Sequence, residues 1–242
     1  INSLNHNNEI EILKENKVNE ISQVEAHPVK KNAVTQAIDQ AAIAKKQEID
    51  LIEDATIEEK EVAKAKVDKI VTEAKNNINQ ATTNSSVDDA QNEGITAINA
   101  VIPEVVKKSD ARDTIDEVAR IKKAAIDQTP DATVEEKEAA IAKIDQEVTK
   151  AKEQIHQALK NENVDTAKTN GTNFINAIQP EITKKIKARE AIDEVARAKK
   201  EAIDRIQDAT TEEKEAAKAK VDQAVTEAKG HINEAINNSG VD

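Results

Sequence analysis

The side chains with the clearest potential for chemistry are four histidines, two repeated pairs of adjacent carboxylates and several repeated pairs of lysines. Imidazole nitrogens and carboxylates could hold a metal ion or transfer protons, but each role requires several such groups to converge. The histidines are His6, His27, His156 and His231. His156 stands where the other copies of an internal repeat carry Asn79 and Asn233. We therefore expect polar surface histidines, and we identify no catalytic, cofactor-binding or metal-ligating residue.

The repeated carboxylates are neighbours in the chain. The pairs are Asp116-Glu117 and Asp193-Glu194. Adjacent residues of a helix do not face each other, so a glycosidase-like pair is unsupported. Each aspartate precedes an arginine, Arg120 or Arg197, by four residues, which is the favourable order for an ion pair along one helix. We expect solvated helix faces with such pairs.

The repeated lysines form the basic element of the chain. They are Lys30-Lys31, Lys45-Lys46, Lys107-Lys108, Lys122-Lys123, Lys184-Lys185 and Lys199-Lys200. Because acids interrupt them and aromatic residues are lacking, they do not form a nucleic-acid-binding stripe. One interpretation is evenly spaced contact with an anionic polymer, such as a cell-wall teichoic acid or a glycosaminoglycan. The interpretation we favour is charge balance within an acidic chain.

Composition excludes several classes of protein. The chain has 242 residues, with 35 Lys and Arg against 47 Asp and Glu, and a net charge of −12. This acidity opposes nucleic-acid binding, and the absence of cysteine removes disulfides and thiolate metal sites. No apolar segment reaches the roughly 18 residues of a membrane span. With Phe174 as the sole aromatic residue, the core must consist mainly of Ala, Val and Ile, and we expect no enzyme.

An internal repeat organises the chain. Glu58-Glu59-Lys60 recurs at 135–137 and at 212–214, a step of 77 residues each time. Residues 112–133 match residues 189–210 at 15 of 22 positions. Such similarity without an insertion indicates tandem copies of one unit, and we expect the chain to be a fragment of a longer array.

Each unit has the signals of three helices. Apolar residues recur at steps of three and four, as in Ala63, Val67, Val71, Ala74 and Ile78. Capping boxes are expected at Thr56 with Glu59, Thr133 with Glu136, and Thr210 with Glu213. The third helix should start near Asp88 or Asp165, with the aspartate as its N-cap. Gly94 and Gly171 lie inside helical patterns, which indicates that two helices approach closely there.

The boundary between units contains no flexible linker. From Pro103 to Gln128, and from Pro180 to Gln207, there is no glycine and no polar loop. Proline suits the first position of a helix, but Ile102 and Gln179 before it are poor N-caps. The helix that starts at the proline should therefore cross the boundary, either continuous with the preceding helix or after a tight uncapped break.

These observations predict an all-α fold of tandem three-helix bundles, joined end to end into an elongated rod. More than about 70% of the residues should be helical. We expect residues 1–9 to be disordered and residues 10–31 to be the last helix of a truncated preceding repeat. Complete units should span 32–108 and 109–185, with a partial unit at 186–242.

The combined motif resembles a known family. Asp-Ala-Thr-x-Glu-Glu-Lys-x-Ala, followed by the pattern of residues 220–235, is similar to the 77-residue helical repeats of giant staphylococcal cell-wall surface proteins. That family comprises the extracellular matrix-binding protein homologue and related wall-anchored proteins implicated in adhesion, biofilm accumulation and methicillin resistance. The resemblance implies secretion, attachment to the cell wall, and a stalk or adhesive region outside the bacterium.

Three functions remain open. The first is a structural stalk that projects an adhesive region from the cell wall. The second is a binding module whose helix faces capture host matrix or plasma proteins, such as fibronectin or fibrinogen. Binding hot spots favour Trp, Tyr and Arg, and the chain offers only five arginines. The third is an intracellular helical scaffold. In each case we expect a monomer that inserts into no membrane.

Overall fold

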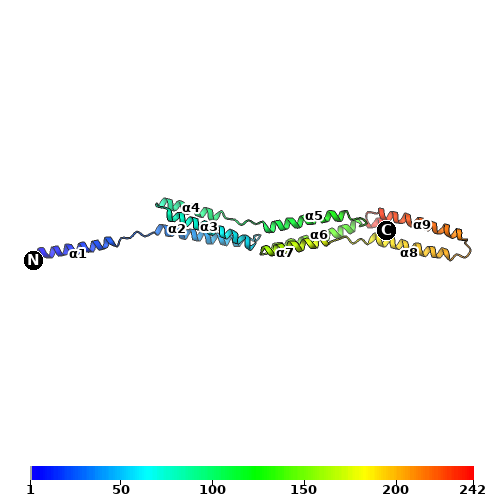
Figure 1. Cartoon of the computed structure of the whole chain (residues 1–242), viewed down its shortest axis with the longest axis horizontal. Coiled ribbons are helices and arrows are strands. Elements are labelled where there is room, and N and C mark those ends of the chain that lie inside the picture. Colours follow the sequence, from blue (N-terminus) through cyan, green and yellow to red (C-terminus); the bar gives the residue numbers. More distant parts are fainter. Residues whose placement is uncertain (1) are drawn as a thin grey trace. The chain divides into compact units, whose positions relative to one another are not determined.

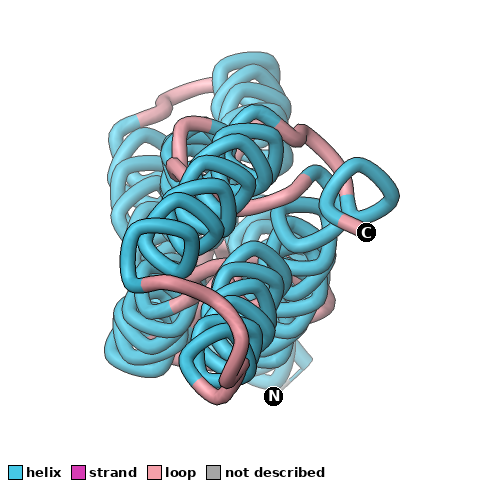
Figure 2. Tube along the Cα trace, turned by 90° about the vertical axis from the view of Figure 1, so that its right-hand side faces the viewer, coloured by secondary structure: helices cyan, strands magenta, loops and turns pink. Residues whose placement is uncertain are grey.

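The computed structural model describes residues 2–242 of the chain. Helices make up 80% of it, and no strand occurs in the described part (Figures 1 and 2). The predicted all-α fold is confirmed. The helices are α1 (Asn2–Ser22), α2 (Val29–Asp50), α3 (Ile57–Gln80), α4 (Asn84–Asn99), α5 (Lys107–Asp127), α6 (Val134–Gln157), α7 (Asn161–Ala177), α8 (Lys184–Asp204), α9 (Thr211–Glu234) and α10 (Asn238–Val241). Across residues 2–242, no helix combines the length and apolar character needed to cross a membrane.

The chain divides into two compact units. Unit 1 comprises residues 1–52 and 61–103, and unit 2 comprises residues 53–60 and 104–242. In unit 1, α2, α3 and α4 form a three-helix bundle around an aliphatic core. The large side chains that are fully buried in this core are Ile38, Ile49, Val67, Ile78 and Ile98. Ion pairs join α2 to α3 beside the core, with Lys75 Nζ 2.7 Å from Asp39 Oδ1.

Unit 2 contains a second bundle of the same kind and a further helix pair. In the bundle, α5, α6 and α7 pack against one another around five fully buried isoleucines (Figure 1). These are Ile115, Ile126, Ile144, Ile155 and Ile175. The helices α8 and α9 pack side by side, and the four-residue α10 contacts both. Residues 184–242 thus supply two long helices and one turn of a third.

Glycine sets the closest helix approach in both bundles, as predicted. A Cβ atom at Gly94 would lie 2.7 Å from the Cβ of Ala74, and one at Gly171 would lie 2.5 Å from the Cβ of Ala151. Real Cβ atoms do not approach this closely. Glycine therefore allows α4 to lie against α3, and α7 to lie against α6, at these positions.

The N-terminal helix differs from the sequence-based expectation. Except for residue 1, which lies outside the described part, the segment 1–9 that we expected to be disordered belongs to α1. Adding residues to an existing helix orders few dihedral angles per hydrogen bond, which favours this extension. The expected single helix over 10–31 is also wrong, because residues 24–28 are not helical. Pro28 lacks an N–H and disfavours helical backbone at His27, so α2 starts after it.

The helix expected to start at each boundary proline is also wrong. Residues 101–106 and 178–183 are not helical, and α5 and α8 begin at Lys107 and Lys184. Proline excludes helical backbone from the residue before it, which separates the preceding helix from the proline. Neither N-cap residue, Val106 or Thr183, makes a side-chain cap hydrogen bond. The exposed N–H groups of both helices need partners from elsewhere.

The third helix of each bundle begins one turn earlier than expected. The helix α4 starts at Asn84, where Thr83 and Ser86 form a capping box. The helix α7 starts at Asn161, and its N-cap Lys160 makes no side-chain cap bond. The expectation that Asp88 or Asp165 acts as the N-cap is therefore wrong, because both lie inside the helix.

Candidate functional site at two helix junctions

The starts of α5 and α8 each contact the turn before an earlier long helix, and both places lie in unit 2. The first junction consists of residues 53–60, the start of α5 and the α6–α7 turn. The second junction consists of residues 130–136, the start of α8 and the α9–α10 turn. Equivalent residues of the two junctions are 77 positions apart. The same contacts are therefore built twice from the same residue types.

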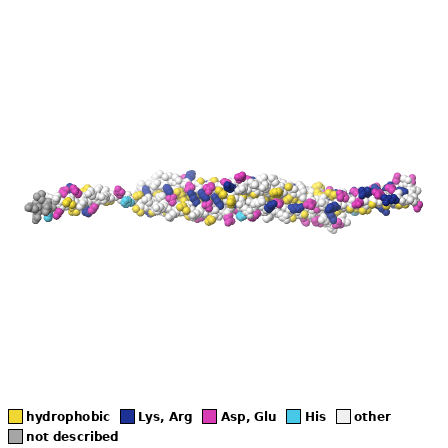
Figure 3. Space-filling model, turned by 90° about the horizontal axis from the view of Figure 1, so that it is seen from below, with side chains coloured by type: hydrophobic (Ala, Val, Ile, Leu, Met, Phe, Trp, Pro, Cys, Tyr) yellow, Lys and Arg dark blue, Asp and Glu magenta, His cyan; other side chains and the backbone are white. Residues whose placement is uncertain are grey.

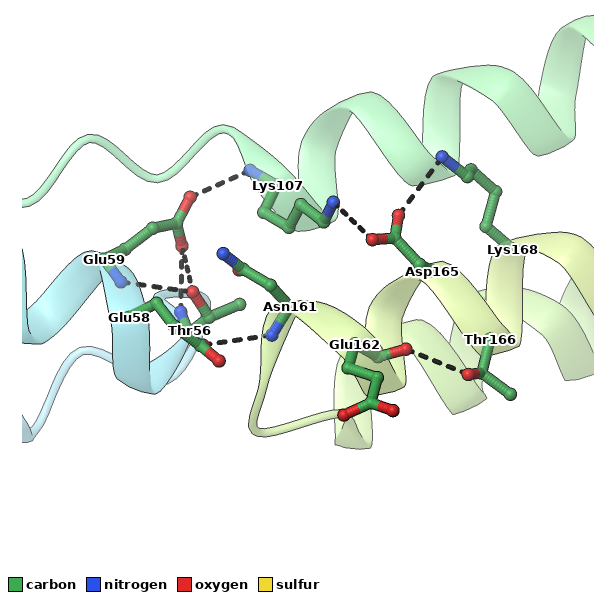
Figure 4. A network of polar contacts seen from close by, with 9 residues as sticks. All are labelled: Thr56, Glu58, Glu59, Lys107, Asn161, Glu162, Asp165, Thr166 and Lys168. Atoms are coloured by element: carbon green, nitrogen blue, oxygen red, sulfur yellow. Dashed lines mark hydrogen bonds and ion pairs between the residues drawn. The ribbon is translucent and has the colours of Figure 1, made fainter.

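One carboxylate closes the first junction (Figure 4). Glu59 Oε2 accepts a hydrogen bond from the backbone N–H of Thr56 at 2.8 Å, which is the return bond of the predicted capping box. Glu59 Oε1 accepts from the backbone N–H groups of Val106 and Lys107, both at 2.9 Å. A single side chain therefore caps both α3 and α5. The helix dipole favours an anion at this place, and charged acceptors make the stronger hydrogen bonds.

Glu136 performs the same two tasks in the second junction. Its Oε2 accepts from the N–H of Thr133 at 3.0 Å, and its Oε1 accepts from the N–H groups of Thr183 and Lys184 at 2.8 and 2.9 Å. The third capping box supplies a comparison. There Glu213 Oε2 accepts from the N–H of Thr210 at 2.9 Å, and in the described structure no second helix start is bonded to this side chain.

A second glutamate and the main chain fix the adjoining turn. In the first junction, Glu58 Oε2 accepts from the N–H of Asn161 at 3.0 Å, which caps α7, and the N–H of Ile57 donates to the carbonyl of Leu159 at 2.8 Å. In the second junction, Glu135 and Val134 make the equivalent bonds with the α9–α10 turn, both at 2.9 Å. The two consecutive glutamates of each junction thus cap the starts of three helices.

The second lysine of each boundary pair is buried. Lys108 is 1% exposed, and its Nζ donates to the carbonyls of His156 at 2.6 Å and Glu53 at 3.1 Å. Lys185 is 5% exposed, and its Nζ donates to the carbonyl of Asn233 at 2.8 Å. These carbonyls of residues 156 and 233 lie in the last turns of α6 and α9, where a cation is favourable. Burial lowers the pKa of Lys108 below its usual range.

An arginine and an aspartate complete each junction. Arg112 Nη2 lies 2.7 Å from Asp54 Oδ1, and the equivalent Arg189 Nη2 lies 2.9 Å from Asp131 Oδ1. The hydrogen bond from Arg112 is the main cause that holds the pKa of Asp54 below its usual range. Each pair links the first helix of one repeat to the turn of the preceding one.

The junction glutamates are anionic at neutral pH. Burial by itself raises the pKa of Glu59, but the N–H groups of Thr56, Lys107 and Val106 outweigh it and hold the pKa below its usual range. The same balance lowers the pKa of Glu136. Both helix starts are therefore capped by a charged acceptor under physiological conditions.

The four histidines lie apart. His6 is in α1, His27 precedes α2, and His156 and His231 lie in the last turns of α6 and α9. His156 Nδ1 is 3.6 Å from Asp54 Oδ1. Throughout the described part of the chain, no three His, Cys, Asp or Glu side chains are grouped so that they could hold a metal ion. The histidines form no common site.

The repeated carboxylates join helices. The expected pair of Asp116 with Arg120 is wrong, because Arg120 Nη2 lies 2.7 Å from Glu117 Oε1 instead. Asp116 Oδ1 reaches Lys152 Nζ in α6 at 2.6 Å. Asp193 makes the equivalent contact with Lys229 in α9, also at 2.6 Å. Each aspartate therefore pairs with a lysine of the neighbouring helix and not with the arginine one turn later in its own helix.

Several of the repeated lysines form ion pairs with aspartates of neighbouring helices. Lys46 Nζ lies 2.5 Å from Asp68 Oδ1, and Lys123 Nζ lies 2.5 Å from Asp145 Oδ1. Lys200 forms the equivalent ion pair with Asp222. Lys107 Nζ lies 2.7 Å from Asp165 Oδ2. On the face seen in Figure 3, basic and acidic side chains are mixed rather than separated. Charge pairing between helices explains the repetition of Lys46, Lys123 and Lys200, and it also involves Lys107.

The arrangement joins each helix start to the turn before an earlier helix through hydrogen bonds to charged side chains. A signal for this junction is present in the sequence, since Glu59 and Glu136 each precede the first lysine of the next Lys-Lys pair, Lys107 or Lys184, by 48 residues. That spacing does not show that one carboxylate reaches two helix starts. The second role of Glu59 and Glu136 was therefore not foreseen.

Comparison with known proteins finds relatives among the extracellular matrix-binding proteins of Staphylococcus aureus. The chain is 30% identical over 208 residues to the "Extracellular matrix-binding protein ebh" of Staphylococcus aureus strain MW2, which covers 85% of this chain and 2% of that protein. It is 28% identical over 214 residues to the "Extracellular matrix-binding protein EbhA" of strain Newman, covering 88% of this chain and 6% of that protein. The chain thus spans a small part of the length of these relatives. No solved structure gives a significant match.

The family comparison covers nearly the whole chain. Three consecutive matches span residues 29–106, 107–183 and 184–242. Each match begins at the first helix of a bundle or helix pair, that is, at α2, α5 or α8. The chain belongs to the family described as Domain of Unknown Function (DUF1542), of which it contains three tandem repeats.

Proposed function

We propose that the chain is a segment of the repeat region of an extracellular, cell-wall-associated bacterial adhesin, and that its repeats act as a stiff spacer. In this role the repeats hold an adhesive region away from the wall. The names of the relatives, which describe matrix-binding staphylococcal proteins, support the setting. The observation that carries the spacer role is the junction in which one glutamate caps two helices.

The second junction supports stiffness within unit 2. The six residues 178–183 between α7 and α8 are not helical and alone would bend. Glu136 binds the end of this segment through Thr183 and Lys184, Arg189 pairs with Asp131, and Glu135 accepts from the N–H of Asn238. Because these contacts join the start of α6 and the turn before it to α8 and α10, bending the segment requires breaking several charged hydrogen bonds together. A spacer needs this property, whereas an isolated binding module does not.

Distance measurement between spin labels tests the proposal. The chain has no cysteine, so Thr169→Cys on α7 and Ala219→Cys on α9, both exposed, place one label on each side of the second junction. We expect a single narrow distance distribution by double electron–electron resonance, and a broader one after Glu136→Gln. A broad distribution in the chain with Glu136 intact would show a flexible junction and refute the spacer role.

A second candidate function is capture of host proteins. The printed names of the relatives favour it, since they describe binding to extracellular matrix. The chain would be immobilised and exposed to fibronectin, fibrinogen and a matrix extract, with surface plasmon resonance as the readout. Saturable binding at micromolar or lower concentration would support this candidate, and its absence would leave the spacer role.

A further inference from the structure

A groove lined by uncharged residues lies between α6 and α7. It has a volume of about 450 Å³, which is within the range of sites that bind small molecules. Its lining includes the small residues Ala158 and Ala167, both only 7% exposed, and a set of polar side chains. The polar side chains are Gln154, Gln157, Asn163, Thr166 and Asn170. Because 34% of the chain is charged, a groove of this size without a charged residue in its lining stands out from the rest of the surface.

Three amide side chains of this groove have no hydrogen-bond partner within the described part of the chain. They are the side-chain amides of Gln154, Asn163 and Asn170. The amide of Gln157 is oriented by its bond to Glu153 Oε1, at 2.5 Å. A side-chain amide presents a donor and an acceptor side by side, and two adjacent hydroxyl groups do the same. The groove therefore matches a ligand that carries several hydroxyl groups and no charge.

The single aromatic side chain of the protein lies at one end of the groove. Phe174 is 55% exposed, and Lys150 Nζ lies 5.3 Å from the centre of its ring. Phe174 follows Asn170 by four residues on α7, and Lys150 precedes Gln154 by four residues on α6, so the ring continues the line of the groove. A sugar ring has a polar edge of hydroxyl groups and an apolar C–H face that packs on an aromatic ring. Amides and one ring in this order suit a saccharide.

The first bundle carries different residues on the equivalent helix face. Three exposed positions of α7 differ from those of α4, 77 positions earlier, and the pairs are Thr166 and Asp89, Asn170 and Glu93, and Phe174 and Ala97. Two of these differences remove a negative charge from α7, and the third adds a ring. Packing does not require them, because both helices bury the same pattern Val-x-x-Ala-x-x-x-Gly-x-x-x-Ile. The differences therefore concern the surface, and unit 1 serves as an internal comparison.

We propose that the α6–α7 groove binds a neutral saccharide. In this site Gln154, Asn163 and Asn170 bind hydroxyl groups, and Phe174 packs against the C–H face of a sugar ring. An anionic saccharide is disfavoured because the residues that line the groove include no cation and the chain has a net charge of −12. An apolar ligand is disfavoured because it would separate the amides from water without replacing their hydrogen bonds. The setting proposed above offers two sources of neutral saccharide, the glycan of the cell wall and the glycans of a host.

An NMR titration tests the site and distinguishes the two sources. The ¹⁵N-labelled chain is titrated with N,N′,N″-triacetylchitotriose, which represents a wall-type glycan, and with lacto-N-tetraose, which represents a host-type glycan. We expect at least one of them to shift the side-chain amide signals of Gln154, Asn163 and Asn170 saturably. The dissociation constant should be about 1 mM, because neutral hydrogen bonds in an open groove compete with water. The probe that binds more tightly identifies the source, and the anionic trigalacturonic acid should bind at least about tenfold more weakly.

Matched variants separate this groove from the rest of the surface. The double variant Gln154→Ala and Asn170→Ala should weaken binding at least about tenfold, and Phe174→Ala about fivefold. Asn176→Ala removes the same kind of amide from an exposed position of α7 outside the groove lining, and it should leave the affinity unchanged. All four positions are exposed, so that circular dichroism should show the same helix content in every variant. No saturation with either neutral probe, equal affinity for the anionic probe, or an equal loss with Asn176→Ala would each overturn the proposal.

Discussion

Replacement of Glu136 by glutamine separates the two tasks of the junction carboxylate. In the native chain one oxygen serves Thr133 and the other serves Thr183 and Lys184. Glutamine has one carbonyl oxygen and one amide group that donates. Whichever way it turns, the N–H groups on one side face a donor instead of an acceptor.

The loss of stability caused by Glu136→Gln can be worked out from these hydrogen bonds. A hydrogen bond to a charged group contributes about 1.5–3 kcal/mol, and a neutral one about 0.5–1.5 kcal/mol. Glu136→Gln loses at least one charged bond and weakens the others, but the side chain is only partly buried and water replaces part of the loss. We expect a destabilisation of the junction by about 2 kcal/mol, which corresponds to a roughly 30-fold faster exchange of the amides that it protects.

Hydrogen exchange of the Thr183 and Lys184 amides measures this effect locally. Glu213→Gln is the matched control, because this glutamate has the same capping bond to Thr210 and no bonded second helix start in the described structure. It should accelerate exchange only within the first turn of α9. If Glu136→Gln leaves the exchange of residues 183 and 184 unchanged, the carboxylate does not hold the junction and the reasoning is wrong.

Three other predictions address packing, burial and pH. Gly171→Ala should lower the midpoint of thermal unfolding, because overpacking costs about 1–3 kcal/mol, whereas Gly230→Ala, with open space around it, should raise it through a gain in helix propensity of about 1 kcal/mol. Lys108→Met leaves two carbonyls without their donor and should destabilise unit 2 by about 2 kcal/mol in denaturant titration, and an unchanged midpoint would contradict its structural role. The folded-state pKa values of Glu59 and Glu136 lie below the ordinary 4.5, so their contribution to stability is complete above that pH and is lost as the pH falls through the lower folded values. Amide protection at the junctions should therefore be constant between about pH 5 and 7 and decrease below about 4.5, and a loss already near pH 6 would exclude these carboxylates as the cause.

The sequence was sufficient for the fold because its signals are local and repeated. Apolar residues at steps of three and four identify the helices, and the capping boxes of Thr133 and Thr210 form as predicted. Gly94 and Gly171 were correctly assigned to close helix contacts. The helical periodicity and the capping boxes depend on residues within a few turns, and each glycine is recognisable by its lack of a Cβ inside a helical pattern.

The junctions could not be predicted in the same way because they depend on residues far apart in the chain. The sequence showed that Val106 and Thr183 are poor caps, but the missing acceptors come from Glu59 and Glu136, 47 residues earlier. We expected a helix to cross the boundary because the local sequence contains no cap for α5 or α8, whereas the cap comes from this distant glutamate. Likewise, Lys108 has the appearance of a surface lysine until the fold places two carbonyls around it.

The distant cap also explains why the repeat length is constant. Glu136 must reach the start of α8 while Glu135 reaches the start of α10. The lengths of the helices and turns between these points must therefore stay constant if both bonds are to form. One added residue in α6 would rotate everything after it by about 100° relative to these two glutamates. Substitutions on exposed faces carry no such penalty. The absence of any insertion between repeats that differ at many surface positions is therefore a consequence of how the repeats are joined.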